Sequence, residues 1–100
     1  MKKIINGKKY DTDTAKFVGM YWNGEVGFGY VREMLYRKKT GEFFLNGYGG
    51  PHTKYRKACG NNSWCEGETI IPMTEAEAKN WGEKSLESDE YEAIFGEVEE

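Results

Sequence analysis

The stretch from Tyr30 to Tyr48 reads YVREMLYRKKTGEFFLNGY. Its two ends, Tyr30–Lys38 and Glu42–Tyr48, are rich in aromatic and branched side chains, which favour β-strands. The connection Lys39-Thr40-Gly41 has three residues and ends in glycine, which is typical of a hairpin that closes with a G1 bulge. The stretch therefore predicts an antiparallel β-hairpin over residues 30–48.

Before this hairpin, Asn6-Gly7 lies between Ile4-Ile5 and Lys8-Lys9-Tyr10. Asn-Gly favours a tight two-residue turn because both residues tolerate positive φ, so extended strands are expected near residues 3–10. The polar run Asp11-Thr12-Asp13 can cap a helix. We therefore expect a short N-terminal helix over residues 13–18, ended by Gly19.

After the hairpin, Thr69-Ile70-Ile71 predicts a strand over residues 69–72 that Pro72 terminates. Thr74 and Glu77 have the spacing of a capping box, which predicts a helix to about Lys84. A second helix is expected from Ser88. The combined pattern is an α+β fold: a small antiparallel sheet made of hairpin 30–48 with strands near 3–10 and 69–72, a short N-terminal helix and two C-terminal helices. Residues 1–100 are expected to form one domain.

The charge of the chain is unevenly distributed. The 100 residues include 14 Lys and Arg and 17 Asp and Glu, a net charge of −3. Residues 1–58 hold 12 of the basic and 5 of the acidic side chains, a net of +7, and residues 59–100 have a net of −10. An aromatic content of 15% argues against a disordered chain. No apolar run approaches the roughly 20 residues of a membrane span, and no secretory signal is evident, so we expect a soluble protein of the cytoplasm.

His52, Cys59 and Cys65 are the only candidate thiol and imidazole ligands. They could supply three zinc ligands, but five residues separate the cysteines, which is wider than in common zinc motifs, and no fourth Cys or His exists. A Cys–His nucleophilic pair would require one of the same thiols with His52. A Cys59–Cys65 disulfide is sterically conceivable but disfavoured in a reducing compartment. We therefore expect reduced thiols and a surface imidazole, with no metal, cofactor or catalytic residue.

Basic side chains interleaved with aromatic ones are the first candidate binding surface. Lys and Arg pair with phosphates, and exposed aromatic rings stack on unpaired bases. The alternative is an ordinary solvated hairpin tip. The candidate nucleic-acid-binding residues, on the hairpin and the following loop, are Arg37, Lys38, Lys39, Lys54, Tyr55, Arg56 and Lys57.

The acidic C-terminal helices are the second candidate surface. A dense acidic surface repels DNA and attracts a basic groove on a protein, where charge complementarity speeds encounter and fixes orientation. The alternative is a solvated acidic helix. The candidate partner-binding residues are Glu83, Glu87, Asp89, Glu90 and Glu92.

Four segments carry a resemblance to known proteins: residues 1–15 (MKKIINGKKYDTDTA), 35–45 (LYRKKTGEFFL), 49–55 (GGPHTKY) and 70–74 (IIPMT). The chain resembles a family of small proteins from phages and mobile elements of Gram-positive bacteria that includes anti-CRISPR proteins acting on type II nucleases. The resemblance implies a non-enzymatic inhibitor in the cytoplasm of the host bacterial cell. Its partner would be the host CRISPR effector nuclease or its guide-RNA complex, which holds nucleic acid in a positively charged channel.

Two other hypotheses remain open at this point. The chain could be a small nucleic-acid-binding accessory protein of a phage or mobile element. It could also be an interaction domain whose aromatic strands pair with a second copy, so either a monomer or a homodimer is compatible with the sequence.

Overall fold

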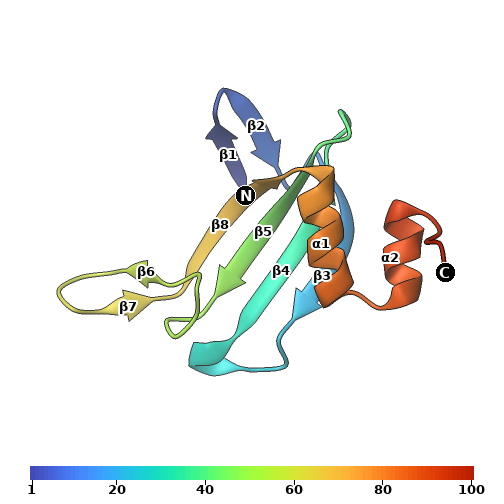
Figure 1. Cartoon of the computed structure of the whole chain (residues 1–100). Coiled ribbons are helices and arrows are strands. Elements are labelled where there is room, and N and C mark those ends of the chain that lie inside the picture. Colours follow the sequence, from blue (N-terminus) through green and yellow to red (C-terminus); the bar gives the residue numbers. More distant parts are fainter.

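A four-stranded antiparallel sheet organises the protein. The computed structural model describes residues 1–100. The strand order in the central sheet is β3-β4-β5-β8, with one short hairpin above the sheet and another beside it (Figure 1). The elements are β1 (Lys2–Ile5), β2 (Lys8–Asp11), β3 (Lys16–Trp22), the short 3-10 helix η1 (Gly27–Gly29), β4 (Val31–Arg37), β5 (Phe43–Gly49), β6 (Lys57–Ala58), β7 (Trp64–Cys65), β8 (Gly67–Met73), α1 (Glu75–Ser85) and α2 (Ser88–Phe95).

The hairpin β4–β5 forms the centre of the sheet. Arg37 pairs with Phe43, and beyond this pair the Lys38 N–H donates to the Glu42 carbonyl at 2.8 Å. Gly41 has a φ of 93°, which a side chain would strain, and this explains the glycine at the end of the connection. The predicted hairpin is therefore present with the expected turn chemistry.

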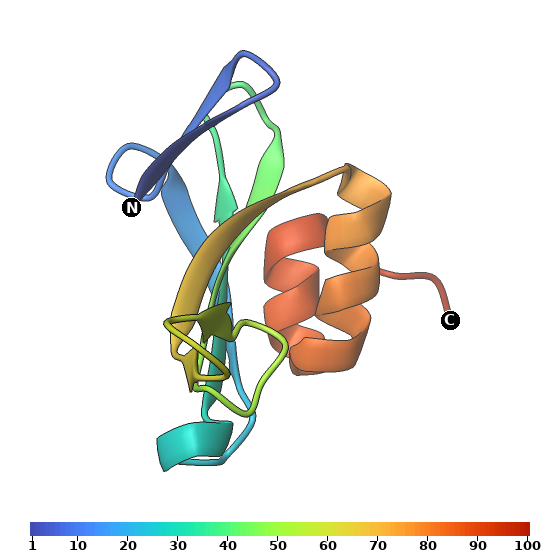
Figure 2. The same ribbon diagram turned by 90° about the vertical axis from the view of Figure 1, so that its left-hand side faces the viewer.

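The two C-terminal helices cover one face of the sheet (Figure 2). Leu35, Phe43 and Leu45 point from β4 and β5 toward α1, where they bury Ala78 and Trp81. The α1 N-terminus has the predicted capping box, in which Thr74 Oγ1 accepts from the Glu77 N–H at 3.1 Å and the Glu77 carboxylate accepts from the Thr74 N–H at 2.9 Å. Neither helix is long and apolar enough to cross a membrane.

The opposite face of the sheet is only half covered. Tyr10 of β2 packs edge-on against Phe44, with ring centroids 5.5 Å apart, and Tyr36 stacks on the same ring at 5.3 Å. The β1–β2 hairpin that carries Tyr10 covers only this end of the face. Further along β3, Met20 and Trp22 remain about half exposed.

The prediction of an N-terminal helix over residues 13–18 is wrong. The Asp11 carboxylate accepts from the Asp13 N–H at 2.9 Å, and the Asp11 carbonyl accepts from the Ala15 N–H at 3.0 Å, so the polar run forms a turn. The chain then enters β3 at Lys16. Pairing with β4 supplies a ladder of backbone hydrogen bonds that is interrupted only by a β-bulge between Phe17 and Gly19, and this tertiary pairing outweighs the local capping signal.

The predicted single small sheet is also wrong. The strands near residues 3–10 form a separate two-stranded sheet, in which β1 pairs only with β2. The strand predicted at 69–72 runs from Gly67 to Met73 and includes Pro72. Proline is tolerated there because β8 lies at the sheet edge, where one side of the strand has no partner.

The segment between β5 and β8 contains structure that the sequence did not reveal. β6 and β7 form a short two-stranded arm that projects from the sheet (Figure 1). A disulfide between Cys59 and Cys65 closes this arm, with the two Cα atoms 5.8 Å apart. The expectation of two reduced thiols is therefore wrong, because the β6–β7 pairing brings the two cysteines within bonding distance.

Candidate functional site

The predicted acidic residues lie together on the helical layer. Glu83 belongs to α1, Glu87 precedes α2, and Asp89, Glu90 and Glu92 belong to α2. All are exposed except Glu92, which is half-buried. None of the five forms an ion pair within the protein, so their charge is available to a partner.

Some of these carboxylates also stabilise the backbone. The Glu90 carboxylate accepts from the Glu87 N–H at 3.3 Å at the start of α2, where Glu87 is the N-cap. The Glu92 carboxylate accepts from the Val98 N–H at 3.3 Å and ties the C-terminal tail to α2. Glu83 and Asp89 have no such structural role.

A hollow of about 670 Å³ lies between the end of α1, α2 and the C-terminal tail. Three carboxylates, those of Glu83, Glu92 and Glu100, line it together with the apolar side chains of Leu86 and Tyr91. The combination of negative charge with an apolar wall suits a long cationic side chain, whose aliphatic stem and charged head need both kinds of contact. We call this feature the acidic hollow.

The structure separates the predicted basic residues into two groups. Arg37, Lys38 and Lys39 lie at the tip of the β4–β5 hairpin, whereas Lys54–Lys57 follow the opposite end of β5. The seven residues of β5 span about 20 Å at the usual rise per residue. The candidate nucleic-acid-binding residues of the hairpin and of the following loop therefore lie at two separate places on the molecule.

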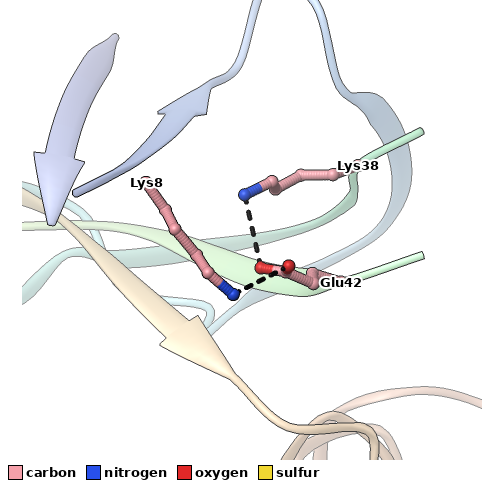
Figure 3. Close-up of polar contacts among 3 residues, drawn as sticks. All are labelled: Lys8, Lys38 and Glu42. Carbon is pink, nitrogen blue, oxygen red and sulfur yellow. Dashed lines mark hydrogen bonds and ion pairs between the residues drawn. The ribbon is translucent and has the colours of Figure 1, made fainter. Parts of the chain in front are cut away.

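At the hairpin tip, Glu42 holds two lysines in place (Figure 3). Its carboxylate lies 3.1 Å from Lys8 Nζ of β2 and 3.3 Å from Lys38 Nζ. The hydrogen bonds from Lys8 and then Lys38 hold the pKa of Glu42 below its ordinary value, and the bond to Glu42 raises the pKa of Lys8. This cluster links the β1–β2 hairpin to the tip and neutralises part of its charge.

The second group surrounds a buried carboxylate. Glu33 of β4 is only 4% exposed. It accepts hydrogen bonds from the Tyr55 hydroxyl and from Trp81 Nε1, the latter at 2.9 Å, and Lys54 Nζ lies 2.9 Å from it. Burial acts to raise the pKa of Glu33, but the three donors outweigh burial and keep this pKa below its ordinary value. Burial and the bond to Glu33 raise the pKa of Tyr55.

Of residues 54–57 only Tyr55 is buried, whereas Lys54 and Arg56 are exposed but already contact Glu33 and Trp64. Tyr55 is buried against Gly47, so its ring cannot stack on a base. The Arg56 guanidinium lies over the ring of Trp64 in β7, 4.0 Å from its centroid, and so contacts the β6–β7 arm. Lys57 is the one exposed cation of this segment that has neither an ion-pair partner nor an aromatic ring beneath it.

The possible zinc ligands do not come together. Cys59 and Cys65 are joined in the disulfide, and the His52 ring packs against Phe28 with centroids 5.3 Å apart. No group of three or more His, Cys, Asp or Glu side chains is arranged to hold a metal ion.

Two important residues escaped the sequence reasoning. Lys16, assigned to the expected helix, lies directly opposite Arg37 in the β3–β4 ladder. In the sequence Glu33 is a single polar residue within a predicted strand. It is buried only because α1 and Tyr55 pack over it and donate hydrogen bonds to its carboxylate. The aromatic and β-branched residues Phe17, Val18 and Tyr21 were an available signal for β3.

No protein-family model, no curated protein and no solved structure matches the chain.

Proposed function

We propose that the protein is a non-enzymatic inhibitor that binds a type II RNA-guided DNA nuclease, or its guide-RNA complex, through the acidic surface of α1 and α2. The observation that supports this proposal is the acidic hollow, where Glu83, Glu92 and Glu100 surround the apolar walls of Leu86 and Tyr91. The resemblance to a family that includes anti-CRISPR proteins supplies the class of partner.

The chemistry of the proposed partner fits this hollow. RNA-guided nucleases hold the heteroduplex in a positively charged channel and read a short DNA motif with arginine side chains. An arginine that enters the hollow can pair its guanidinium with the carboxylates of Glu83 and Glu100, while its stem contacts Leu86 and Tyr91. The helical surface would then occupy a site that DNA phosphates otherwise fill.

A DNA-cleavage assay with purified nuclease, guide RNA and target tests the proposal. The protein is added either before or after guide loading. Inhibition in both orders indicates competition with DNA, whereas inhibition only before loading indicates interference with the guide RNA. Absence of inhibition in both orders, with type II nucleases of Gram-positive hosts, would refute the proposal.

A pair of charge-matched variants tests the hollow itself. The variant Glu83→Gln/Glu100→Gln removes two carboxylates that line the hollow, and the control Glu97→Gln/Glu99→Gln removes two exposed carboxylates from the same tail. Loss of charged hydrogen bonds should raise the half-inhibitory concentration of the first variant about tenfold or more. Equal effects of both variants would show that inhibition depends only on the total charge of the protein. Circular dichroism checks that both variants remain folded.

A further inference from the structure

The hairpin tip carries cations that no acidic residue of the protein neutralises. Lys16 of β3 lies opposite Arg37 of β4 in the sheet register. Both residues, with Lys38 and Lys39, line a hollow of about 280 Å³ at this end of the sheet. We call these four residues the basic end.

Only one cation of the basic end has an acidic partner. Lys38 is paired with Glu42, whereas Lys16, Arg37 and Lys39 have no carboxylate within ion-pair distance. The Arg37 guanidinium instead lies over the Phe43 ring, 5.3 Å from its centroid, which holds it at the surface. The basic end therefore keeps three unneutralised charges next to one another.

Aromatic and apolar side chains continue from the basic end along β3. Phe17 follows Lys16 and so points to the other face of β3, the face away from the helices, where it is 49% exposed and packs edge-on against Tyr36 with centroids 5.8 Å apart. A second hollow of about 320 Å³ lies between the start of β3 and α2, because Ala93 and Ile94 line it together with Lys16, Phe17, Val18 and Arg37, and it adjoins the first hollow. Met20 and Trp22, on the same face of β3 as Phe17, are likewise about half exposed.

We propose that the basic end and the adjoining face of β3 bind single-stranded nucleic acid. Phosphates contact Lys16, Arg37 and Lys39, and an unstacked base packs on the Phe17 ring. Lys and Arg supply affinity for the phosphate backbone, and an exposed ring can accept any base. A strand that continues in the same direction reaches Trp22, which offers a second stacking surface at the far end of β3.

The aromatic side chains favour a single strand over a duplex or an acidic protein. Bases in a duplex are stacked on one another and cannot cover Phe17 without being unstacked, which costs free energy. An acidic peptide would pair with the three cations but would leave the Phe17 ring without a stacking partner. The carboxylates Asp89, Glu90 and Glu92 on α2 would repel phosphates, which directs the strand along β3 rather than over the helices.

Fluorescence anisotropy with labelled uridine and thymidine oligonucleotides of about 12 nucleotides tests this site. No nuclease is present, so the result is independent of the proposed inhibitory function. Three phosphate contacts predict a slope of about −2 in a plot of log affinity against log salt, hence about a 20-fold loss of affinity between 50 and 200 mM salt. Absence of binding to both oligonucleotides at 50 mM salt would overturn the proposal.

The cations are tested with two charge-matched triple variants. Lys16→Ala/Arg37→Ala/Lys39→Ala should abolish most of the salt dependence by reducing the slope by about 2. The control replaces three exposed lysines outside the basic end, Lys2, Lys9 and Lys84, with alanine. If the control loses as much affinity as the first variant, binding follows net charge alone and the assignment of the site is wrong.

The stacking contact is tested with Phe17→Leu, which keeps an apolar side chain but removes the ring. Affinity for single strands should fall about fivefold or more, whereas affinity for inorganic polyphosphate, which has no bases, should not change. A duplex of the same length should bind more weakly than the single strand. Equal binding of polyphosphate and oligonucleotide, with no effect of Phe17→Leu, would show a general polyanion surface and refute the nucleic-acid site.

Discussion

The substitution Tyr55→Phe should measurably destabilise the protein, because it removes one donor from the buried Glu33 carboxylate. Glu33 is 4% exposed and receives hydrogen bonds from the Tyr55 hydroxyl, Trp81 Nε1 and Lys54 Nζ. Phenylalanine fills the same space beside Gly47 but donates nothing. The change therefore isolates the hydrogen bond from the packing of the ring.

The expected magnitude follows from the charge of the acceptor. Hydrogen bonds to charged groups contribute about 1.5–3 kcal/mol, roughly twice a neutral bond. For 100 residues the entropy of unfolding is about 0.2 kcal/mol per kelvin, so this loss lowers Tm by about 7–14 °C. Trp81 is a neighbour of the same carboxylate and provides a fluorescence signal for unfolding.

Urea denaturation of a double-mutant cycle provides the measurement. Tyr55→Phe, Glu33→Gln and the double variant are compared with the wild type, and the coupling free energy between the two positions should be at least about 1 kcal/mol. The reasoning would be refuted if Tyr55→Phe lowered the free energy of unfolding by less than about 0.5 kcal/mol and showed no coupling to Glu33. That result would show that Glu33 is held in place by packing and not by its donors.

The pH dependence of the same network has a definite sign. Because the pKa of Glu33 in the folded protein lies below its ordinary value of 4.5, its contribution to stability is present above pH 4.5 and is lost as the pH falls through the lowered pKa. The pKa of Tyr55 is raised above 10.0, so its contribution is present below pH 10 and is lost at higher pH. Urea denaturation at pH 7, 4 and 3 should show the penalty of Tyr55→Phe unchanged above pH 4.5 and shrinking below it, where a neutral carboxyl accepts a weaker bond.

Three further substitutions have clear expected outcomes. In Gly47→Ala the added Cβ overlaps the Tyr55 ring. This overpacking should lower the free energy of unfolding, measured by urea denaturation, by about 1–3 kcal/mol. Thr74→Ala removes the side-chain half of the α1 capping box and should cost about 1 kcal/mol, measured the same way; an unchanged midpoint would contradict the role of the cap. Cys59→Ser opens the disulfide of the β6–β7 arm and should speed amide hydrogen exchange in the arm, while the amides of Phe43–Gly49 stay protected. Equal deprotection of both regions would show that the arm unfolds together with the sheet.

The acidic hollow and the basic end lie on different parts of the molecule. The hollow is formed by α1, α2 and the C-terminal tail, whereas the basic end is formed by the start of β3 and the tip of the β4–β5 hairpin. The net charge of −3 therefore combines two surfaces of opposite sign. Substitutions at one surface can be tested without changing the other, which keeps the inhibitory and nucleic-acid-binding proposals separable.

The helices and the central hairpin could be predicted because their signals are local. A G1 bulge needs a residue with positive φ, which explains the glycine at position 41. Thr74 and Glu77 have the three-residue spacing of a capping box, which marks the start of α1. The residues before β3 show the limit of such reasoning. Asp11 and Asp13 can begin either a helix or a turn, and the choice depends on whether β4 is available as a pairing partner.

The sequence by itself determined the hairpin, the two C-terminal helices and the division of charge, because turn geometry, capping and composition depend on residues that are close in the chain. Only the tertiary structure decided which charged residues meet. It placed Lys16 opposite Arg37, removed Tyr55 from the surface predicted for nucleic acid, paired the exposed Lys54 with Glu33, and buried Glu33 among its three donors. Those contacts join residues far apart in the chain, and they arise from strand register and from the packing of α1 on the sheet, which no local pattern specifies.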